Sequence, residues 1–347
     1  MAVKTSLRSG QRILAPGSLL CALVLVPSLV TGCGVSSSPL PSVNGKAAPG
    51  VPGGAILGYV WSSNDGTLRP LLGVSGSAQV GQSIVARDAY VSGAASIPSG
   101  LGLVEDQKGN LFSLNLPSSA VTPIASGLPA QSQIIFSPLG VDAIVYASGG
   151  ASVTLISALS SQPQTTTIAL PSGIKLVAAI VSDAGTVVVE TQAAPVAIDI
   201  LSPSGALLPL TTVAQAGGMT FQPGAENALV ADRGKNAISL LENISTGLTV
   251  EPLNGQGINL PVAVASSRDS RWAVVANGGD KNILRIDLQN GSAPSIVSCS
   301  CQATQLSSLA GSAAFRLNDL GNGPLWIAEL SGSAPQLFFV PAIHLSN

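Results

Sequence analysis

Short apolar runs alternate with small polar clusters along the chain after residue 54. The clearest example extends from Pro261 to Leu288, where three apolar runs are separated by the polar clusters Ser267–Ser270 and Gly278–Lys281. Runs of four to seven residues bounded by Gly, Asp, Asn and Ser are typical of β-strands joined by tight turns. The pattern therefore predicts three consecutive strands, and the stretch from Gly218 to Leu241 repeats the same order.

This unit recurs at a nearly constant interval. The last residue of the expected second strand serves as a marker in each copy, and successive markers are 43, 42, 42, 42, 45 and 52 residues apart. The markers are Ser63, Asp106, Ser148, Glu190, Asp232, Asn277 and Glu329. Repeats of ~40 to 50 residues are typical of propeller blades. The sequence therefore predicts an all-β fold, a seven-bladed β-propeller of four-stranded antiparallel blades.

The best-preserved copy also resembles a known repeat. Pro261, Ala276–Asn277, Asn282 and Ile286–Asp287 match the YVTN-type repeat of bacterial surface propellers, although the turn Ser267–Ser270 departs from the Ser-Pro-Asp-Gly-like turn of that family. The other copies match in outline. The resemblance implies a seven-bladed fold, and it implies little about activity because the family's members are mostly uncharacterised.

The two ends of the repeat array are incomplete. The first copy lacks an obvious innermost strand, and little chain follows Val340 to finish the last copy. Propellers commonly close by letting one terminus complete the blade that the other begins, which removes exposed strand edges. We expect residues 342–345, or the segment just before Ile56, to supply the missing strand, and the sequence leaves open which of them does so.

The first 33 residues have the pattern of an export signal. Lys4, Arg8 and Arg12 form a basic segment, and the uncharged, mostly apolar stretch 13–30 follows it. This order is typical of a secretory signal peptide. Prolines and a glycine interrupt the apolar stretch, which favours cleavage over a membrane-spanning helix.

The end of this signal, residues 29–33, has the sequence Leu-Val-Thr-Gly-Cys and resembles the lipobox of bacterial lipoproteins. The resemblance implies that Cys33 is lipidated, with palmitate-like acyl chains, and becomes the new N-terminus. Several acyl chains give a stable anchor, since each buried methylene contributes ~0.8 kcal/mol. We expect an outer-membrane location, because Gly34 stands where an inner-membrane retention signal would have aspartate. The alternative is an ordinary signal peptide that leaves Cys33 free.

These observations divide the chain into three parts. Residues 1–32 are the expected lipoprotein signal peptide. Residues 33–54, rich in Gly, Pro and Ser, are an expected flexible tether, because such a composition cannot pack a core. Residues 55–347 are the expected propeller, which can use this length as one domain.

Charge and composition exclude several classes of partner. Loss of the signal peptide leaves 12 basic residues against 17 acidic ones, so the mature chain carries a formal charge of −5. No basic stripe is present and aromatic residues are only 3% of the chain, so nucleic acid is not an expected partner. Charged residues make up 9%, which suits strands covered on both faces by neighbouring sheets. No cofactor or metal is expected.

The marker residues are also the candidate ligand-binding residues. Connections between second and third strands of a propeller open onto one face around the central channel. All seven markers would then share that face, and the candidate ligands are the five with carboxylate or amide side chains: Asp106, Glu190, Asp232, Asn277 and Glu329. Clustered oxygens suit a cation or a polyol. The alternative is that Asp and Asn serve only the tight turns, through hydrogen bonds to the backbone.

Two further features concern chemistry. The single histidine, His344, lies near the end of the chain, where it is a poor general base, so no catalytic residue is assigned. Cys299 and Cys301 are two residues apart, which on a strand places them at the limit of disulfide reach. We expect a disulfide, because export favours oxidation. A copper or redox site is the alternative.

The leading hypothesis is a lipid-anchored envelope propeller that binds or scaffolds a protein or envelope ligand without catalysis, by analogy of fold. The alternative is a lactonase-like hydrolase that uses carboxylates at the channel mouth, since propeller lactonases have a similar fold. A third hypothesis is an envelope-assembly factor, although the quinoprotein-type repeats of those propeller lipoproteins are absent from this chain.

Overall fold

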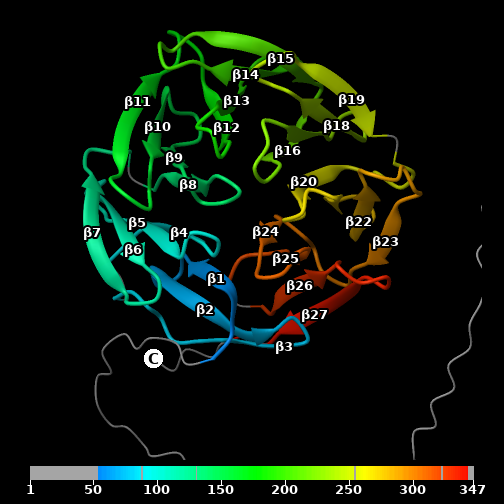
Figure 1. Ribbon diagram of the computed structural model, residues 1–347, viewed down its shortest axis with the longest axis horizontal. Coiled ribbons are helices and arrows are strands. Elements are labelled where there is room, and N and C mark those ends of the chain that lie inside the picture. The colour runs from blue at the N-terminus through cyan, green and yellow to red at the C-terminus, as the bar shows by residue number, and fades with distance from the viewer. Residues whose placement is uncertain (1–53, 87–88, 130, 254, 322, 343–347) are drawn as a thin grey trace, which may run out of the picture. The chain divides into compact units, whose positions relative to one another are not determined.

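The structure is a computed structural model that describes residues 54–342 apart from 87–88, 130, 254 and 322. In this part of the chain all regular structure is β, and the strands form seven antiparallel sheets arranged as a ring (Figure 1). Six of the sheets have four strands, and the first has three. The predicted all-β, seven-bladed propeller is confirmed.

Each blade is a meander of consecutive strands, with the earliest strand nearest the centre of the ring and the last at the rim (Figure 1). Blades 1 to 4 comprise β1 Ile56–Ser62, β2 Thr67–Val74 and β3 Ser77–Val80; β4 Ser92–Ser96, β5 Leu101–Glu105, β6 Leu111–Asn115 and β7 Ala120–Ala125; β8 Gln133–Phe136, β9 Ala143–Tyr146, β10 Ser152–Ser157 and β11 Gln164–Ala169; β12 Leu176–Val181, β13 Val187–Thr191, β14 Val196–Leu201 and β15 Leu207–Val213. Blades 5 to 7 comprise β16 Ala216–Phe221, β17 Ala228–Asp232, β18 Ala237–Glu242 and β19 Thr249–Leu253; β20 Pro261–Ser266, β21 Trp272–Asn277, β22 Asn282–Asp287 and β23 Ser295–Ser298; β24 Ser307–Ser308, β25 Ala314–Arg316, β26 Leu325–Glu329 and β27 Gln336–Val340.

The hydrophobic core is divided among the interfaces between blades. The described residues form seven buried clusters, and each cluster joins two neighbouring blades. For example, Ile180 and Val188 of blade 4 pack with Phe221 and Val230 of blade 5. Because a blade buries its faces only against its neighbours, the free energy gained from apolar burial depends on completing the ring.

Burial along each blade explains the low content of charged residues. Every residue of the second strands β13 and β17 is buried. The outermost strands are exposed, and three of them contain a proline within the strand, at Pro123, Pro209 and Pro252. Proline cannot donate a ladder hydrogen bond, so it protects a rim strand against pairing with another sheet.

The turns between first and second strands of neighbouring blades contact one another through hydrogen bonds and packing. Asp183, in the β12–β13 turn, accepts hydrogen bonds from Leu139 N and Gly224 N, both at 2.8 Å. These two amides belong to the equivalent turns of blades 3 and 5. In the turn of blade 3, Gly140 has φ 72° and packs against Ser96 of blade 2, where a Cβ would collide with the serine hydroxyl. In blades 2 to 5 these turns are therefore linked by hydrogen bonds and packing, and they are called the turn girdle below.

Blades 7 and 1 meet through contacts of the same kind. Ala310 N donates to Leu57 O at 2.6 Å, and Ser75 Oγ donates to Glu329 Oε2 at 2.9 Å. Leu57 and Val340 share one buried cluster. The segments expected to complete the first blade, 343–345 and the residues before 54, lie outside the described residues.

Blade 7 differs from its expected register. Its second strand is β25, which ends at Arg316, and the loop from Asn318 to Pro324 connects β25 to the third strand, β26. Glu329 therefore ends a third strand, so its assignment to the end of the second strand is wrong. The irregular, glycine-rich loop obscured the second strand, which has only three residues.

The expected signal peptide and most of the expected tether lie outside the described residues, as does Cys33. The described part of the chain has no helix with the length and hydropathy needed to span a bilayer.

Candidate functional site

The centre of the ring contains a cavity of about 530 Å³. Its wall is formed by the innermost strands of blades 2 to 7 and by the turns that follow them. The lining in blades 4 to 6 covers residues 178–181, 218–223 and 262–268, which are the later parts of those strands and their turns. The cavity therefore lies towards the turn girdle, away from the connections between second and third strands.

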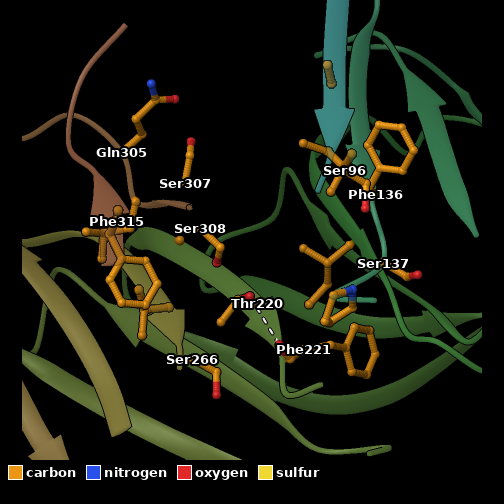
Figure 2. Close-up of a pocket in the computed structure, with 18 of the residues that line it drawn as sticks. Ser96, Phe136, Ser137, Thr220, Phe221, Ser266, Gln305, Ser307, Ser308 and Phe315 are labelled. Atoms are coloured by element: carbon orange, nitrogen blue, oxygen red, sulfur yellow. Dashed lines mark hydrogen bonds between the residues drawn. The ribbon is translucent and has the colours of Figure 1, made fainter. Parts of the chain in front are cut away.

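The wall is almost entirely uncharged. Among the described lining residues, Arg268 in the turn after β20 alone has a formal charge, and it is exposed. Phe136 is partly exposed, whereas Phe221 and Phe315 lie behind the wall as buried members of the cores between blades. Figure 2 shows hydroxyl groups from several blades around the same space, and the labelled ones belong to Ser96, Ser137, Thr220, Ser266, Ser307 and Ser308.

The hydroxyls of the wall differ in their existing hydrogen bonds. Ser137 Oγ accepts from the backbone N–H groups of Val141 and Asp142 at 3.1 and 3.2 Å, so its own proton remains to be donated. Thr220 and Ser266 instead donate to backbone carbonyls at 3.3 and 3.2 Å, so their lone pairs remain to accept. Ser137 and Ser266 are only 2% and 6% exposed, however, so of these three residues Thr220 is the most open to the cavity.

Three of the five candidate residues are held in turns. Asp106 Oδ1 accepts from Lys108 N and Asn110 N at 2.8 and 2.9 Å, and these bonds, with one from the Asn110 side chain, lower its pKa. Asp232 accepts four backbone N–H bonds, and Asn277 Oδ1 accepts from Asn259 N. None of the three lines the cavity. Turn stabilisation, the alternative considered above, accounts for these contacts.

Glu190 has a different environment. It lies in β13, where it is 2% exposed, and burial raises the pKa of its carboxyl to about 7. Its negative charge contributes, after burial, to raising the pKa of Tyr146 in blade 3. Tyr146 lines the cavity and donates to Gln133 Oε1 at 2.8 Å. Glu190 therefore does not line the cavity, but its charge acts on a residue that does.

Glu329 lies at the opposite end of its blade from the other candidates. It ends the third strand of blade 7 and accepts from Ser75 and from Ser331 in the following turn. The expectation that all five residues share one face is therefore wrong for this residue. Among residues 54–342, apart from the gaps given above, no group of three or more His, Cys, Asp or Glu side chains is placed to hold a metal ion.

Sequence reasoning missed a second buried carboxylate. Glu105, which ends β5 immediately before Asp106, is fully buried, and burial raises its pKa. Its Oε2 accepts from Ser132 N at 2.9 Å, whereas Oε1 has no partner in the described part of the protein. The signal that could have identified it is an acidic residue at the end of the apolar run Leu101–Glu105, because second strands of blades are covered on both faces. The hydroxyls of the wall carried no comparable signal.

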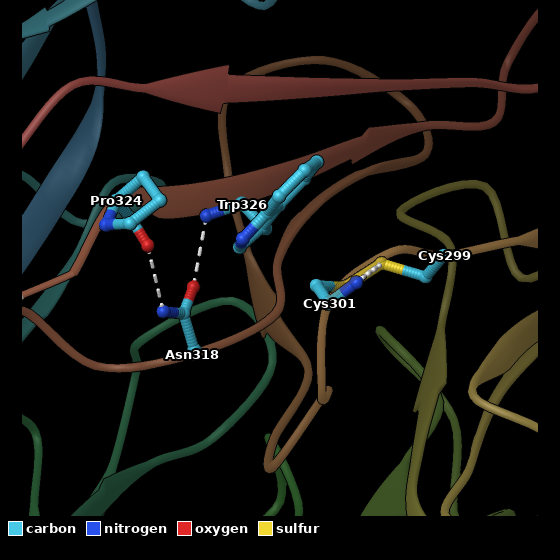
Figure 3. Close-up of a disulfide and its surroundings, with 5 residues drawn as sticks. All are labelled: Cys299, Cys301, Asn318, Pro324 and Trp326. Atoms are coloured by element: carbon cyan, nitrogen blue, oxygen red, sulfur yellow. Dashed lines mark hydrogen bonds between the residues drawn. A yellow bond between two sulfur atoms is a disulfide. The ribbon is translucent and has the colours of Figure 1, made fainter.

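Cys299 and Cys301 are joined by a disulfide, with Cα atoms 5.0 Å apart (Figure 3). Both residues follow the end of β23, in the connection to blade 7, instead of lying on a strand. Each is 7% exposed and belongs to the core between blades 6 and 7. His344 lies outside the described residues.

Comparison with known proteins identifies the fold alone. The sequence matches no family model and no curated protein. A functionally unknown protein from Desulfotomaculum acetoxidans is 15% identical, with a TM-score of 0.57 over 83% of this chain and 100% of that one. A protein from Lactobacillus plantarum is 12% identical, with a TM-score of 0.56 over 82% and 96%. Virginiamycin B lyase from Staphylococcus aureus is 12% identical, with a TM-score of 0.52 over 75% and 86%. At these identities the likeness supports a propeller architecture and no particular activity.

Proposed function

We propose that this protein is a lipid-anchored propeller of the cell envelope that acts as a binding or scaffold module for a protein or another envelope ligand. The observation that carries the proposal is the central cavity, where six blades present uncharged polar and apolar groups to one space. Such walls suit recognition, because binding pockets are mostly apolar with a few placed polar groups.

The location is part of this proposal. It rests on the basic segment, the apolar run and the lipobox-like residues that end at Cys33. Labelled palmitate should enter the wild-type protein in a bacterial host and should not enter the Cys33→Ser variant. Fractionation should place the wild type with the outer membrane. Equal labelling of both proteins would refute lipidation at Cys33.

Binding is tested by photo-crosslinking in intact envelopes, followed by affinity purification and mass spectrometry. We expect a discrete crosslinked species that is absent when an unrelated lipoprotein with the same tether replaces this protein. Recovery of the same species with both proteins would show that the signal comes from proximity at the membrane, and the proposal for a macromolecular partner would fail.

A hydrolase is the second candidate, and the observation that favours it is Glu190. A buried carboxyl with a pKa of about 7, close to a tyrosine of the cavity wall, has the properties of a general base at neutral pH. If the candidate is correct, a small lactone is hydrolysed at a rate that rises through pH 7. That rate should be lost in Glu190→Gln and retained in Glu251→Gln, which changes an exposed rim residue. Equal rates in the two variants would eliminate this role for Glu190.

A further inference from the structure

Blade 1 has three strands among the described residues where the other blades have four, and its contacts with blade 7 show which positions they occupy. The turn between β2 and β3 lies beside the turn between the third and fourth strands of blade 7. Ser75 Oγ donates to Glu329 Oε2, and a Cβ on Gly76 would lie 3.3 Å from the ring of Phe338. β2 and β3 are therefore the third and fourth strands of their blade, and β1 is the second. Consistently, the described residues of blade 1 contribute nothing to the cavity wall.

Part of the inner edge of β1 has backbone groups that can pair with another strand. Tyr59 and Trp61 lie opposite Pro70 and Leu68 of β2, whose carbonyls accept hydrogen bonds from the β3 side of the sheet. Two opposite residues of antiparallel strands direct their backbone groups either towards each other or away from each other. The N–H and C=O groups of Tyr59 and Trp61 therefore point to the centre of the ring. On that side they have no backbone partner in the described part of the chain.

The other end of this edge, at the turn girdle, is already occupied. Leu57 O accepts from Ala310 N of blade 7 at 2.6 Å. A Cβ on Gly58 would collide with Leu309 of blade 7 and contact Ile97 of blade 2, so these two side chains fill the space beside it. The open part of the edge is therefore short, and it lies at the end of β1 away from the turn girdle.

The path of the chain distinguishes the two segments that could pair with this edge. From blade 2 to blade 7, the chain leaves each rim strand and enters the innermost strand of the next blade after two to eight residues. Blade 1 is the next blade after β27, which ends at Val340 (Figure 1). The segment before Ile56 arrives elsewhere, because Ala55 O accepts from Gly73 N at 2.8 Å and so remains in the ladder with β2.

The sequence after Val340 agrees with this path. Ile343 and Leu345 alternate with His344 and Ser346, which is the period of a strand. A strand that began at residue 343 would leave a connection of two residues, the same length as between β15 and β16.

We propose that residues 343–347 form the innermost strand of blade 1, antiparallel to β1, and make backbone hydrogen bonds with Tyr59 and Trp61. This strand joins the last blade to the first and supplies the wall of the cavity on the side of blade 1. The inference is independent of what the cavity binds.

Hydrogen exchange of single amides in the folded full chain, measured by mass spectrometry with electron-transfer fragmentation, tests this pairing. The amides of Tyr59 and Trp61 should exchange roughly 100-fold more slowly in the wild type than in a variant truncated after Ala342, because pairing makes local opening rare. The amide of Val60, which faces β2, is the internal control and should be protected in both proteins. Rapid exchange of Tyr59 and Trp61 in the wild type would overturn the proposal. Equal protection in both proteins would also overturn it, and would assign the edge to the segment before residue 54 or to a second molecule.

Truncation could loosen the whole ring, so a crosslink is measured in the untruncated chain. Tyr59→Cys is combined in turn with Ile343→Cys, His344→Cys and Leu345→Cys. After mild oxidation we expect one combination to form a disulfide nearly completely, because opposite residues of paired strands come within disulfide reach. The matched control replaces Tyr59→Cys by Val74→Cys, an exposed position at the end of β2. If no Tyr59 combination crosslinks more than its Val74 control, residues 343–347 do not pair with β1.

The two measurements stand separately. Circular dichroism and thermal melting show whether the truncated variant folds. If it does not, the crosslinks and the exchange rates of the wild type decide the proposal alone.

Discussion

The ends of the second strands differ between two parts of the ring. In blades 5 and 6 the strand ends in a short side chain, Asp232 or Asn277, that bonds to nearby backbone amides. In blades 2 and 4 the longer side chains of Glu105 and Glu190 occupy the corresponding region, where they are buried and have raised pKa values. The ends of the second strands therefore serve turn stability in some blades and hold a buried titratable group in others.

The different roles of these side chains follow from their lengths and from the groups within their reach. An Asx side chain ends close enough to its own backbone to satisfy amides two or three residues ahead, as Asp232 does for Gly234 and Lys235. A glutamate is one methylene longer, and Glu105 instead bonds to Ser132 of the next blade. Its carboxylate becomes part of an interface between blades, where burial disfavours the charged form.

The largest effect is expected at Asp232. Replacement by alanine removes the acceptor for four backbone N–H groups, at 2.9 to 3.3 Å, and should lower the free energy of unfolding by roughly 2 to 4 kcal/mol. Chemical denaturation measures the change. Asp232→Asn keeps one acceptor oxygen and should lose less. Equal losses in the two variants would show that these bonds are not the cause.

Glu190 should give the clearest dependence on pH. Its folded-state pKa is raised from 4.5 to about 7, so the folded state binds more protons than the unfolded state between these values. The contribution of Glu190 to the free energy of unfolding should be greatest below pH 4.5 and should fall as the pH rises to about 7. Above pH 7 it should stay constant. Glu190→Gln should remove this slope and gain on the order of 2 kcal/mol at pH 8. Denaturation at pH 5 and pH 8 tests the sign, and an unchanged slope would contradict the assignment.

Asn277→Asp should convert a turn-stabilising residue into a buried acid. Asn277 Nδ2 donates to Gly257 O and Asn282 Oδ1 at 2.6 and 2.8 Å, and an ionised carboxylate cannot donate. We expect a loss of roughly 1 to 3 kcal/mol at pH 8, with partial recovery at pH 4, where a protonated carboxyl can make one of these bonds. A loss of the same size at both pH values would indicate a packing effect instead.

Glu105→Gln should have the smallest effect on stability at neutral pH. The amide oxygen can still accept from Ser132 N, and the buried charge is gone, but the new NH₂ group occupies the position where Oε1 has no partner in the described residues. These contributions oppose each other, so we expect a net change below about 1 kcal/mol. Stability should nevertheless decline less between pH 5 and pH 8 than in the wild type, since burial raises the pKa of Glu105. A slope identical to that of the wild type would show that Glu105 does not titrate in this range.

The sequence predicted the fold well because the blade is a local structure. All strands and turns of one blade lie within about 42 consecutive residues. Periodic apolar runs and clusters of Gly, Asn and Asp therefore identified most blades. The prediction was wrong in blade 7 because β25 has three residues and eight residues separate it from β26, which left β26 as the clearest apolar run. The local sequence pattern does not reveal which of two apolar runs is the second strand of the blade and which is the third.

The candidate site was less predictable, because it depends on contacts between blades. Nothing in the chain near Ser137, Thr220 or Ser266 marks these residues as neighbours, since successive ones are 83 and 46 positions apart. Glu105 and Asp106 are adjacent, yet only the tertiary structure shows that β5 ends at Glu105, which is buried, and that Asp106 lies in the turn.

The amino-acid sequence by itself determined the strand-and-turn repeat, the number of blades and the low charge of the surfaces that stack, because all three follow from local patterns and composition. Only the tertiary structure decided where the cavity lies, which hydroxyls surround it and which carboxylates are buried. Those properties arise when the ring closes and blades far apart in the sequence present their innermost strands to a common space.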